Sequence, residues 1–402
     1  MNDLTSQDVV RTRRPDPRAR KRPAVPAPLV GCAVLLSTVL TGLACRKERT
    51  YTSEVRDGVR YVHNLGPASE KPAAGPAFVR KIGELESKDP DYQFTRPMSV
   101  AEDGRGNLFI LDDKEGRIKK FGPDRKFLLQ FGRKGQGPGE FQYPMTVDIG
   151  ASGQVVVSTM SSEFHVFDND GAYVDHFRLP PYRGISPAIL GSDRIVVYAF
   201  QANGENNRDN HILAVFDFQG RIKHEFGEPF LLDTARKTWN ANFLSLAVDE
   251  DESIFVAFSS LNRIEKYSPE GNLLLSIDRT LPFEVTHSYV KSSMDIGGKV
   301  VPVDEPDFTP VNSGIGIDGR GRIWVLSFRK GVTRSQAPKD YNIRDYLAFE
   351  IYSPEGILLS RIPLPPEIVK FDSMTLHGDH VFFVDPFDQA CIHEYAVVDP
   401  ED

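Results

Sequence analysis

The sequence predicts an all-β protein: a six-bladed β-propeller of four-stranded antiparallel blades, closed by an N-terminal strand. A cassette of four short strands with turns between them recurs about six times. The composition fits, because 26 Phe and 13 Tyr against 2 Trp suit the half-buried surfaces of sheets. A repeat packs only on its neighbours, so 402 residues can form one unit.

The best copy of the cassette spans residues 96–141. A first strand leads into the acidic turn Asp103-Gly104, and a second strand begins after Asn107. A third strand ends at Phe121, and a fourth strand follows the turn at Asp124-Arg125. Four short strands separated by turns are typical of one propeller blade.

The same marks recur along the chain. Second strands are predicted to begin at Asn107, Gln154, Arg194, Ser253, Arg322 and His380. Turns between third and fourth strands are predicted at Asp124-Arg125, Asp170-Gly171, Gln219-Gly220, Glu270-Gly271 and Glu355-Gly356. Glycine at such turns favours tight hairpins that need a positive φ.

The last copy, from Phe371 to about Val398, contains only three strands. An unfilled position would leave an open sheet edge, which closed architectures avoid. Residues 78–83 resemble the fourth strand at 128–132. We therefore expect a propeller over 78–398 in which 78–83 completes the last blade.

At these residues the chain resembles the NHL-type six-bladed β-propellers. The matching features of the best copy are Pro97, Val100-Ala101, Asp103-Gly104, Gly106-Asn107, Phe109-Ile110, Arg117 to Phe121 and Phe131-Gly132. The resemblance extends to a subgroup of bacterial envelope lipoproteins. It implies the fold of about 320 residues and leaves the activity open.

The N-terminus has the pattern of an export signal. Residues 1–28 hold seven basic residues, and an apolar segment of 16 residues, Leu29 to Ala44, follows. It ends at Gly42-Leu43-Ala44-Cys45, which resembles a lipoprotein cleavage site and makes Cys45 the candidate for lipidation. Simple cleavage nearby and an uncleaved anchor are the alternatives. We expect 1–45 to be the signal and 46–77 a polar tether, with a short strand at 60–64.

Charge and cysteine content exclude several classes of protein. Without the first 44 residues the chain has 48 − 7 = 41 basic and 56 − 3 = 53 acidic residues, a net charge of −12. Such a chain has no electrostatic footprint for nucleic acid. A lipidated Cys45 would leave Cys391 alone, which excludes an internal disulfide and favours a buried, inert thiol. We expect a monomer.

Chain order places the long insertions on one face, because second-to-third strand loops and blade-to-blade links share it. Loops longer than about 12–15 residues are usually functional or disordered. The insertions are 201–210, 229–241, 279–312 and 329–345, and the candidate ligand-binding residues in them are Trp239, Tyr289, Arg329, Lys330, Arg334 and Tyr341. The loop at 329–345 is basic and the link at 279–312 is acidic. Either the two satisfy each other, or both face a shared ligand.

A metal site at the mouth of the central channel is a further hypothesis. Asn242, Asn312 and Asp372 lie near the starts of three successive inner strands, and their oxygens suit Ca²⁺. No histidine spacing resembles a Zn²⁺ motif, and no nucleophile elbow or phosphate loop is present.

The expected function is binding. The sequence favours a lipid-anchored propeller of the bacterial cell envelope, facing the periplasm or the exterior, that holds a protein, peptide or glycan on its loop-rich face. The alternative is a metal-assisted lyase or hydrolase, similar to lactonases, with its site at the channel mouth.

Overall fold

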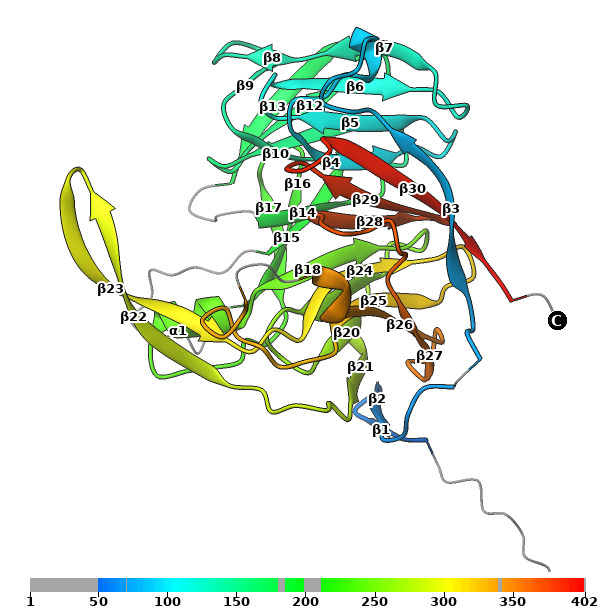
Figure 1. Cartoon of the computed structure of the whole chain (residues 1–402), viewed down its shortest axis with the longest axis vertical. Coiled ribbons are helices and arrows are strands. Elements are labelled where there is room, and N and C mark those ends of the chain that lie inside the picture. Colours follow the sequence, from blue (N-terminus) through cyan, green and yellow to red (C-terminus); the bar gives the residue numbers. More distant parts are fainter. Residues whose placement is uncertain (1–49, 70, 180–184, 199–210, 339–341, 401–402) are drawn as a thin grey trace, which may run out of the picture. The chain divides into compact units, whose positions relative to one another are not determined.

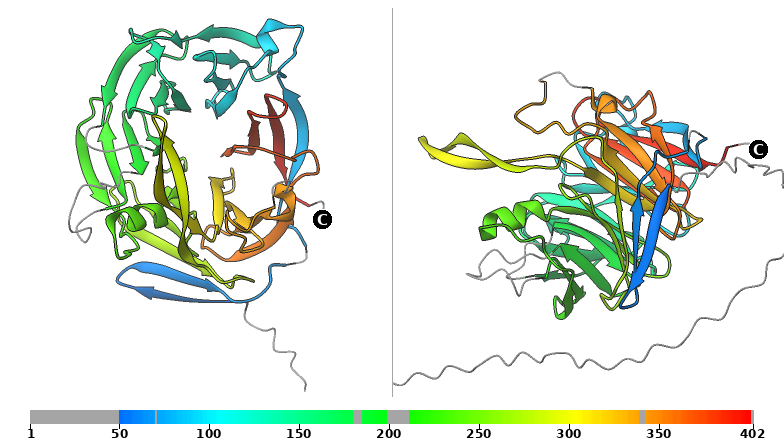
Figure 2. Two further views of the ribbon diagram at one scale, coloured as in Figure 1. Left: turned by 60° about the vertical axis from the view of Figure 1, so that its left-hand side comes forward. Right: turned by 90° about the horizontal axis from the view of Figure 1, so that it is seen from below.

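The computed structural model describes residues 50–69, 71–179, 185–198, 211–338 and 342–400. Six antiparallel sheets stand around a common axis, as Figures 1 and 2 show. The predicted fold class, an all-β six-bladed propeller closed by an N-terminal strand, is confirmed.

The first three blades are continuous in sequence. Blade 1 contains β4 (Pro97–Glu102), β5 (Leu108–Asp112), β6 (Arg117–Phe121) and β7 (Phe127–Phe131). Blade 2 contains β10 (Pro144–Ile149), β11 (Val155–Thr159), β12 (Glu163–Phe167) and β13 (Tyr173–Arg178). Blade 3 contains β14 (Ile185–Leu190), β15 (Arg194–Tyr198), β16 (Leu213–Asp217) and β17 (Ile222–Phe226).

Two of the other three blades, blades 4 and 6, include N-terminal strands. Blade 4 contains β18 (Leu244–Val248), β19 (Ile254–Phe258), β20 (Ile264–Tyr267) and β21 (Leu273–Arg279), and β2 (Val59–Asn64) and β1 (Tyr51–Arg56) extend its outer edge. Blade 5 contains β24 (Asn312–Ile317), β25 (Ile323–Phe328), β26 (Leu347–Tyr352) and β27 (Leu358–Pro363). Blade 6 contains β28 (Ser373–His377), β29 (His380–Asp385), β30 (Cys391–Val398) and β3 (Gly75–Ile82).

Shorter elements occupy the links and loops. They are η1 (Pro90–Tyr92), β8 (Arg133–Lys134), β9 (Glu140–Phe141), α1 (Ala235–Ala241), the long hairpin of β22 (His287–Ile296) and β23 (Lys299–Phe308), and η3 (Ile343–Asp345).

The hydrophobic core lies between the blades. Second strands are buried along their whole length, as in β5, β11 and β19. Six clusters of buried side chains each join two neighbouring blades. The cluster between blades 6 and 1, for example, packs Phe382 and Ile392 against Leu108 and Phe121. Each blade is therefore stabilised by both neighbours.

The turns between third and fourth strands have the backbone that the sequence predicts. Gly271 has φ +86°, and a Cβ there would lie 2.7 Å from the ring of Phe226 on the preceding blade. Gly171 likewise has φ +83° and abuts Phe131 of the preceding blade. Glycine is needed here both for the left-handed conformation and for the close approach.

The ring closes through β3, as predicted. Antiparallel pairing runs from Gly75 opposite Val398 to Ile82 opposite Ile392. The strand therefore begins three residues before the expected start at Phe78.

The segment 46–77, expected as a polar tether, differs from that expectation, because much of it is folded against the blades. β2 pairs in parallel with β21 of blade 4, and Val62 is fully buried there. The Ala73 N–H donates to Ser360 Oγ of blade 5 at 3.0 Å, and Ala74 is fully buried. The alternating polar residues of this segment suggest a solvated tether when the sequence is considered alone, but such residues can equally form a strand at a sheet edge.

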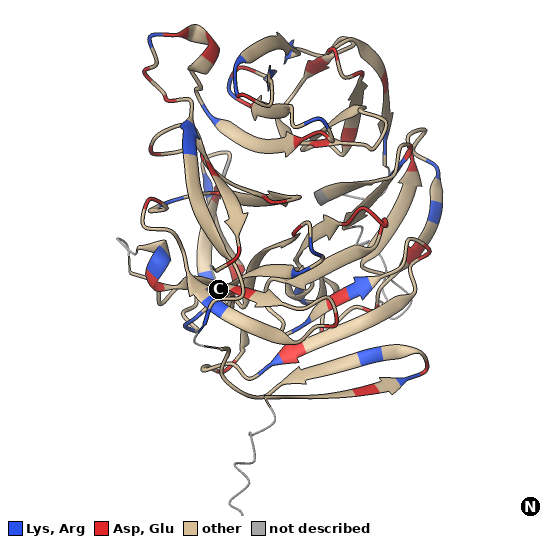
Figure 3. Cartoon of the chain, turned by 90° about the vertical axis from the view of Figure 1, so that its right-hand side faces the viewer, with Lys and Arg blue, Asp and Glu red and all other residues tan. Residues whose placement is uncertain are grey.

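Charged residues of both signs are interspersed over the described blades (Figure 3). Among the described residues, no helix is both long and apolar enough to cross a membrane.

Candidate functional site

The candidate site is the loop-rich face over blades 4 and 5. It consists of α1, the hairpin β22–β23 and the segment 329–338 with 342–346. Figures 1 and 2 show the hairpin extending away from the blades, further than any other described element. The structure places α1 beside β23, and the base of the hairpin beside the segment 333–335.

Helix α1 is held by its caps and by packing below it. The Thr234 side chain caps its N-terminus by accepting from the Lys237 N–H at 3.3 Å. Trp239 is half-buried, with its ring 4.9 Å from that of Phe243. Its carbonyl accepts a hydrogen bond from the Tyr198 hydroxyl at 2.9 Å. Trp239 therefore anchors the helix to the core between blades 3 and 4.

Aromatic side chains fix the base of the hairpin. Asn240 Nδ2 of α1 donates to the Tyr289 hydroxyl at 3.1 Å, and the Lys237 ammonium lies 5.4 Å from the centre of that ring. The Tyr289 ring packs edge-on against Phe308 with a centroid distance of 5.3 Å. His287 Nε2 lies 2.9 Å from the Ser260 carbonyl of blade 4. The hairpin base is thus rigidly held.

The basic loop meets the hairpin at Asp307. This buried carboxylate accepts from Thr333 Oγ1 at 2.9 Å, from the Ser335 N–H at 2.8 Å and from Ser335 Oγ at 2.6 Å. Burial acts to raise the pKa of Asp307, but these hydrogen bonds outweigh it and lower the pKa. Arg334 Nη1 lies 3.5 Å from Glu305 of β23.

Two alternatives were predicted for the charged loops: that they satisfy each other, or that they face a shared ligand. The contacts support the first alternative for some residues and leave others available for the second. Asp307 and Arg334 are satisfied by the partner loop. Arg329 and Lys330 are exposed, and neither has a carboxylate within 4.0 Å among the described residues. The Lys330 ammonium lies 5.2 Å from the ring centre of Tyr346. Tyr341 and the insertion 201–210 lie outside the described residues, as does Cys45.

Two of the three predicted metal ligands, Asn242 and Asn312, bond to protein groups. Asn242 is fully buried; its Oδ1 accepts from the Phe230 N–H at 2.8 Å, and its Nδ2 donates to the Phe230 and Thr238 carbonyls. Asn312 Oδ1 accepts from Arg279 Nη2 at 2.7 Å. Neither amide bonds to another member of the predicted set. The pKa of Asp372 is raised because its carboxylate is partly desolvated.

A buried polar network below the hairpin escaped the sequence analysis. Arg279 ends β21, and its Nε lies 2.5 Å from Glu350 Oε2 of blade 5. The same carboxylate oxygen accepts from Ser327 Oγ at 2.9 Å and from the Tyr352 hydroxyl at 2.8 Å. Charged residues within predicted strands were the available signal, but nothing in the sequence pairs Arg279 with Glu350.

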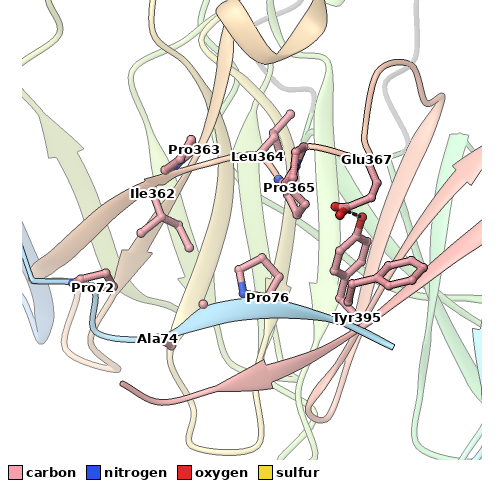
Figure 4. A pocket seen from close by; sticks show the side chains of 12 residues that line it. Pro72, Ala74, Pro76, Ile362, Pro363, Leu364, Pro365, Glu367 and Tyr395 are labelled. Carbon is pink, nitrogen blue, oxygen red and sulfur yellow. Dashed lines mark hydrogen bonds between the residues drawn. The ribbon is translucent and has the colours of Figure 1, made fainter. Parts of the chain in front are cut away.

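A cavity of about 430 Å³ lies between blade 5, blade 6 and the N-terminal segment (Figure 4). Its walls are mostly prolines and aliphatic residues. The polar side chains in the lining are Tyr395 and Glu367, and the Tyr395 hydroxyl donates a hydrogen bond of 3.3 Å to the Glu367 carboxylate. The lining includes Pro72, Pro76, Ile362, Leu364, Glu367 and Tyr395. None of the predicted ligand-binding residues lies in it.

Cys391 is fully buried, and burial raises the pKa of its thiol to about 12. A thiol that stays protonated is a poor nucleophile, and the predicted burial of this thiol is confirmed.

Comparison with known proteins supports the fold. No known protein family profile matches the chain. A stretch of 141 residues, 34% of this chain, is 26% identical to Protein brain tumor of Drosophila melanogaster, and the match covers 13% of that protein. The activity of that whole protein therefore does not transfer.

Two solved structures from Bacteroides superpose on most of the chain. A DUF4221 family member from Bacteroides vulgatus covers 83% of this chain and all of its own, with a TM-score of 0.54 and 9% identity. A protein of Bacteroides fragilis whose name describes it as exported covers 85% of this chain and all of its own, with a TM-score of 0.52 and 11% identity. At these identities the likeness concerns the fold: the chain is a six-bladed β-propeller.

Proposed function

We propose that the protein is a binding module of the bacterial cell envelope, attached by a lipid on Cys45, that captures a protein, peptide or glycan on its loop-rich face. The NHL-like cassette and the export signal pattern support the class and the location. The observation that carries the binding role is the hairpin β22–β23, which projects from a firmly anchored base.

The hairpin tip has features of a contact surface. Met294 is 50% exposed and Val300 is 67% exposed, on strands that face each other across Gly297-Gly298. Exposed apolar residues at the end of a projecting hairpin have no role in the core. Arg329 and Lys330 of the neighbouring loop are exposed and have no carboxylate within 4.0 Å among the described residues. An exposed apolar tip with basic side chains on the neighbouring loop suits an acidic, partly apolar ligand.

Site-specific photo-crosslinking in the intact envelope tests the proposal. A photoreactive residue placed at 294 or 300 should give a discrete cross-linked product. The same residue at Leu274 or Ile222, exposed at 40% and 44% on outer strands, is the matched control. Equal cross-linking at all four positions would contradict a site on the hairpin.

Shortening the hairpin gives an independent test. Ser292 pairs with Val303, so joining them through Gly-Gly removes the tip and keeps the register. Capture should be lost with the melting temperature unchanged, because the tip projects away from the blades. Capture that survives this change would refute the assignment.

Metal-assisted catalysis at the channel mouth stays a prediction. The amides of Asn242 and Asn312 already bond to protein groups, which favours structural roles. Stoichiometric Ca²⁺ in the purified protein that is lost in the Asp372→Asn variant would support this alternative.

A further inference from the structure

Three potential metal ligands meet on one face of blade 6. Asp385 of β29 lies directly opposite Cys391 of β30, and His393 follows two residues later on the same side. The three residues are 2%, 0% and 5% exposed. A donor atom from each lies within 4.8 Å of the others, and Cys391 Sγ is 3.4 Å from His393 Nε2.

Asp385 is a buried carboxylate without a cationic partner. Among the described residues it accepts only backbone N–H groups, from Phe387 at 3.1 Å, Asp388 at 2.9 Å and Gln389 at 3.3 Å. No Lys, Arg or His nitrogen of the described residues lies within ion-pair distance of it. Buried charges are ordinarily paired or bound to metal.

The other buried carboxylates of the ring fall into two groups: Asp112 and Asp307, like Asp385, are held by backbone N–H or hydroxyl donors, whereas others have a cationic partner. Glu350 is paired with Arg279, and Glu394 with Arg125. His393 faces the thiol with its Nε2, and its other nitrogen, Nδ1, is buried without a hydrogen-bond partner among the described residues. The cluster thus brings together a carboxylate, a thiol and an imidazole, all buried and with no Lys or Arg among the described residues paired to the carboxylate.

We propose that Asp385, Cys391 and His393 bind Zn²⁺. Thiolate, imidazole and carboxylate are its preferred ligands. With metal–sulfur and metal–nitrogen distances of about 2.3 and 2.1 Å, a tetrahedral angle separates the two donors by about 3.6 Å. The 3.4 Å observed between Sγ and Nε2 matches this separation closely.

The remaining features complete the site. The backbone N–H groups on Asp385 orient the carboxylate, as outer hydrogen bonds do at metal sites. Gln389 is exposed, with Oε1 4.0 Å from Sγ, so a fourth donor enters from the solvent side: this amide or a water. On binding, the Cys391 S–H bond breaks, a zinc–sulfur bond forms and the proton leaves to solvent.

The site ties β29 to β30 beside the strand that closes the ring. Ile82 and Lys81 of β3 pair with Ile392 and His393. Zinc should therefore raise the thermal stability of the closed ring, because it binds the folded state and not the separated strands.

The test uses the full chain with Cys32 and Cys45 changed to serine, so that Cys391 is the sole thiol. After chelator treatment, one Zn²⁺ per chain should bind and raise the melting temperature. Co²⁺ in its place should give a sulfur-to-metal charge-transfer band. Cys391→Ser should abolish that band and weaken Zn²⁺ binding by at least about 100-fold.

The matched control is His165→Gln. His165 is also buried in a third strand with an unpartnered Nδ1, but it lies in no ligand cluster. This variant should keep full zinc affinity. If Cys391→Ser does not fold, Asp385→Asn and His393→Gln replace it, each with at least a tenfold loss expected. Sub-stoichiometric zinc, or affinity unchanged in the three ligand variants, would overturn the proposal.

Discussion

Arg125 occupies the turn position that is glycine in blades 2 to 5. Its φ is +62°, a left-handed conformation that non-glycine residues rarely adopt. The side chain explains the exception. Its Nη2 lies 2.7 Å from both Glu102 Oε1 and Glu394 Oε1, and all three residues are buried. A cation bridging blades 1 and 6 replaces the glycine contact seen elsewhere.

We expect Arg125→Gln to destabilise the protein by about 3–5 kcal/mol, because it removes the buried cation that bridges Glu102 and Glu394 and leaves them only the partly exposed His380 and Arg80. Denaturant unfolding at neutral pH measures the change. Adding Glu394→Gln should recover part of the loss. Lys126→Gln, next in sequence and with an exposed side chain, should have an effect below about 0.5 kcal/mol. Equal effects of the two single variants would contradict a buried ion cluster.

His380 makes this cluster sensitive to pH. Its Nδ1 lies 2.7 Å from Glu102 Oε2, and that hydrogen bond raises the pKa of His380. A raised folded-state pKa contributes stability that is complete below about pH 6.5, the ordinary histidine pKa, and is lost as pH rises through the folded-state pKa.

The melting-temperature difference between the native chain and His380→Gln should therefore be larger at about pH 5.5 than at about pH 8.5. The ring is 40% exposed at its side chain, so the contribution should stay below about 1 kcal/mol. Scanning calorimetry across this range measures it. A difference that grows toward alkaline pH would contradict the assigned sign.

At the scale of elements, the two strands of the hairpin β1–β2 differ in burial: β1 is mostly exposed, and β2 is partly buried against blade 4. Val62 of β2 is fully buried against Leu275 and Ile277 of blade 4, whereas Val55 of β1 is 67% exposed. Asn64 extends the contact to blade 5, where its Nδ2 donates to the Gly356 carbonyl at 3.1 Å.

Val62→Ala should destabilise the protein by about 2 kcal/mol, through lost burial and the cavity that remains. Val55→Ala, the same substitution in the same hairpin, should change stability by less than about 0.5 kcal/mol. Urea denaturation of both variants measures the pair. Similar values for the two would mean that the hairpin does not pack on blade 4 in solution.

The individual elements were largely predictable. Second strands predicted from Asn107, Gln154 and Ser253 begin at Leu108, Val155 and Ile254. The short strand expected at 60–64 is β2. Such segments have alternation and turn residues that act locally. Helix α1 and the hairpin β22–β23 were seen only as long insertions, because their conformation depends on packing against blade 4.

At the scale of the whole molecule, the N-terminal segment crosses three blades. It pairs with β21 of blade 4, reaches Ser360 of blade 5 and ends as the outer strand of blade 6. The described parts of residues 51–82 therefore link blades 4, 5 and 6, next to the place where β3 pairs with β30 and closes the ring.

Removing this N-terminal segment in two stages should separate the contribution of the hairpin β1–β2 to stability from that of the closing strand β3. A chain starting at residue 68 lacks β1 and β2 but keeps β3, and it should melt cooperatively at a lower temperature. A chain starting at residue 84 lacks the closing strand and should lose its cooperative transition, because β30 becomes an open edge. Calorimetry of both chains is the measurement. A cooperative, near-native melt of the shorter chain would contradict closure by β3.

The repeat, the number of blades and the position of the closing strand were all encoded locally, in turns and alternation that recur along the chain. The choice of interaction partners between distant parts of the ring was not encoded locally. Arg125 with Glu394, Arg279 with Glu350, and the meeting of Asp385 with His393 depend on strand register and blade order. A pair distant in sequence leaves no pattern in one chain, so the folded ring alone decided which charges are buried together and which ligands converge.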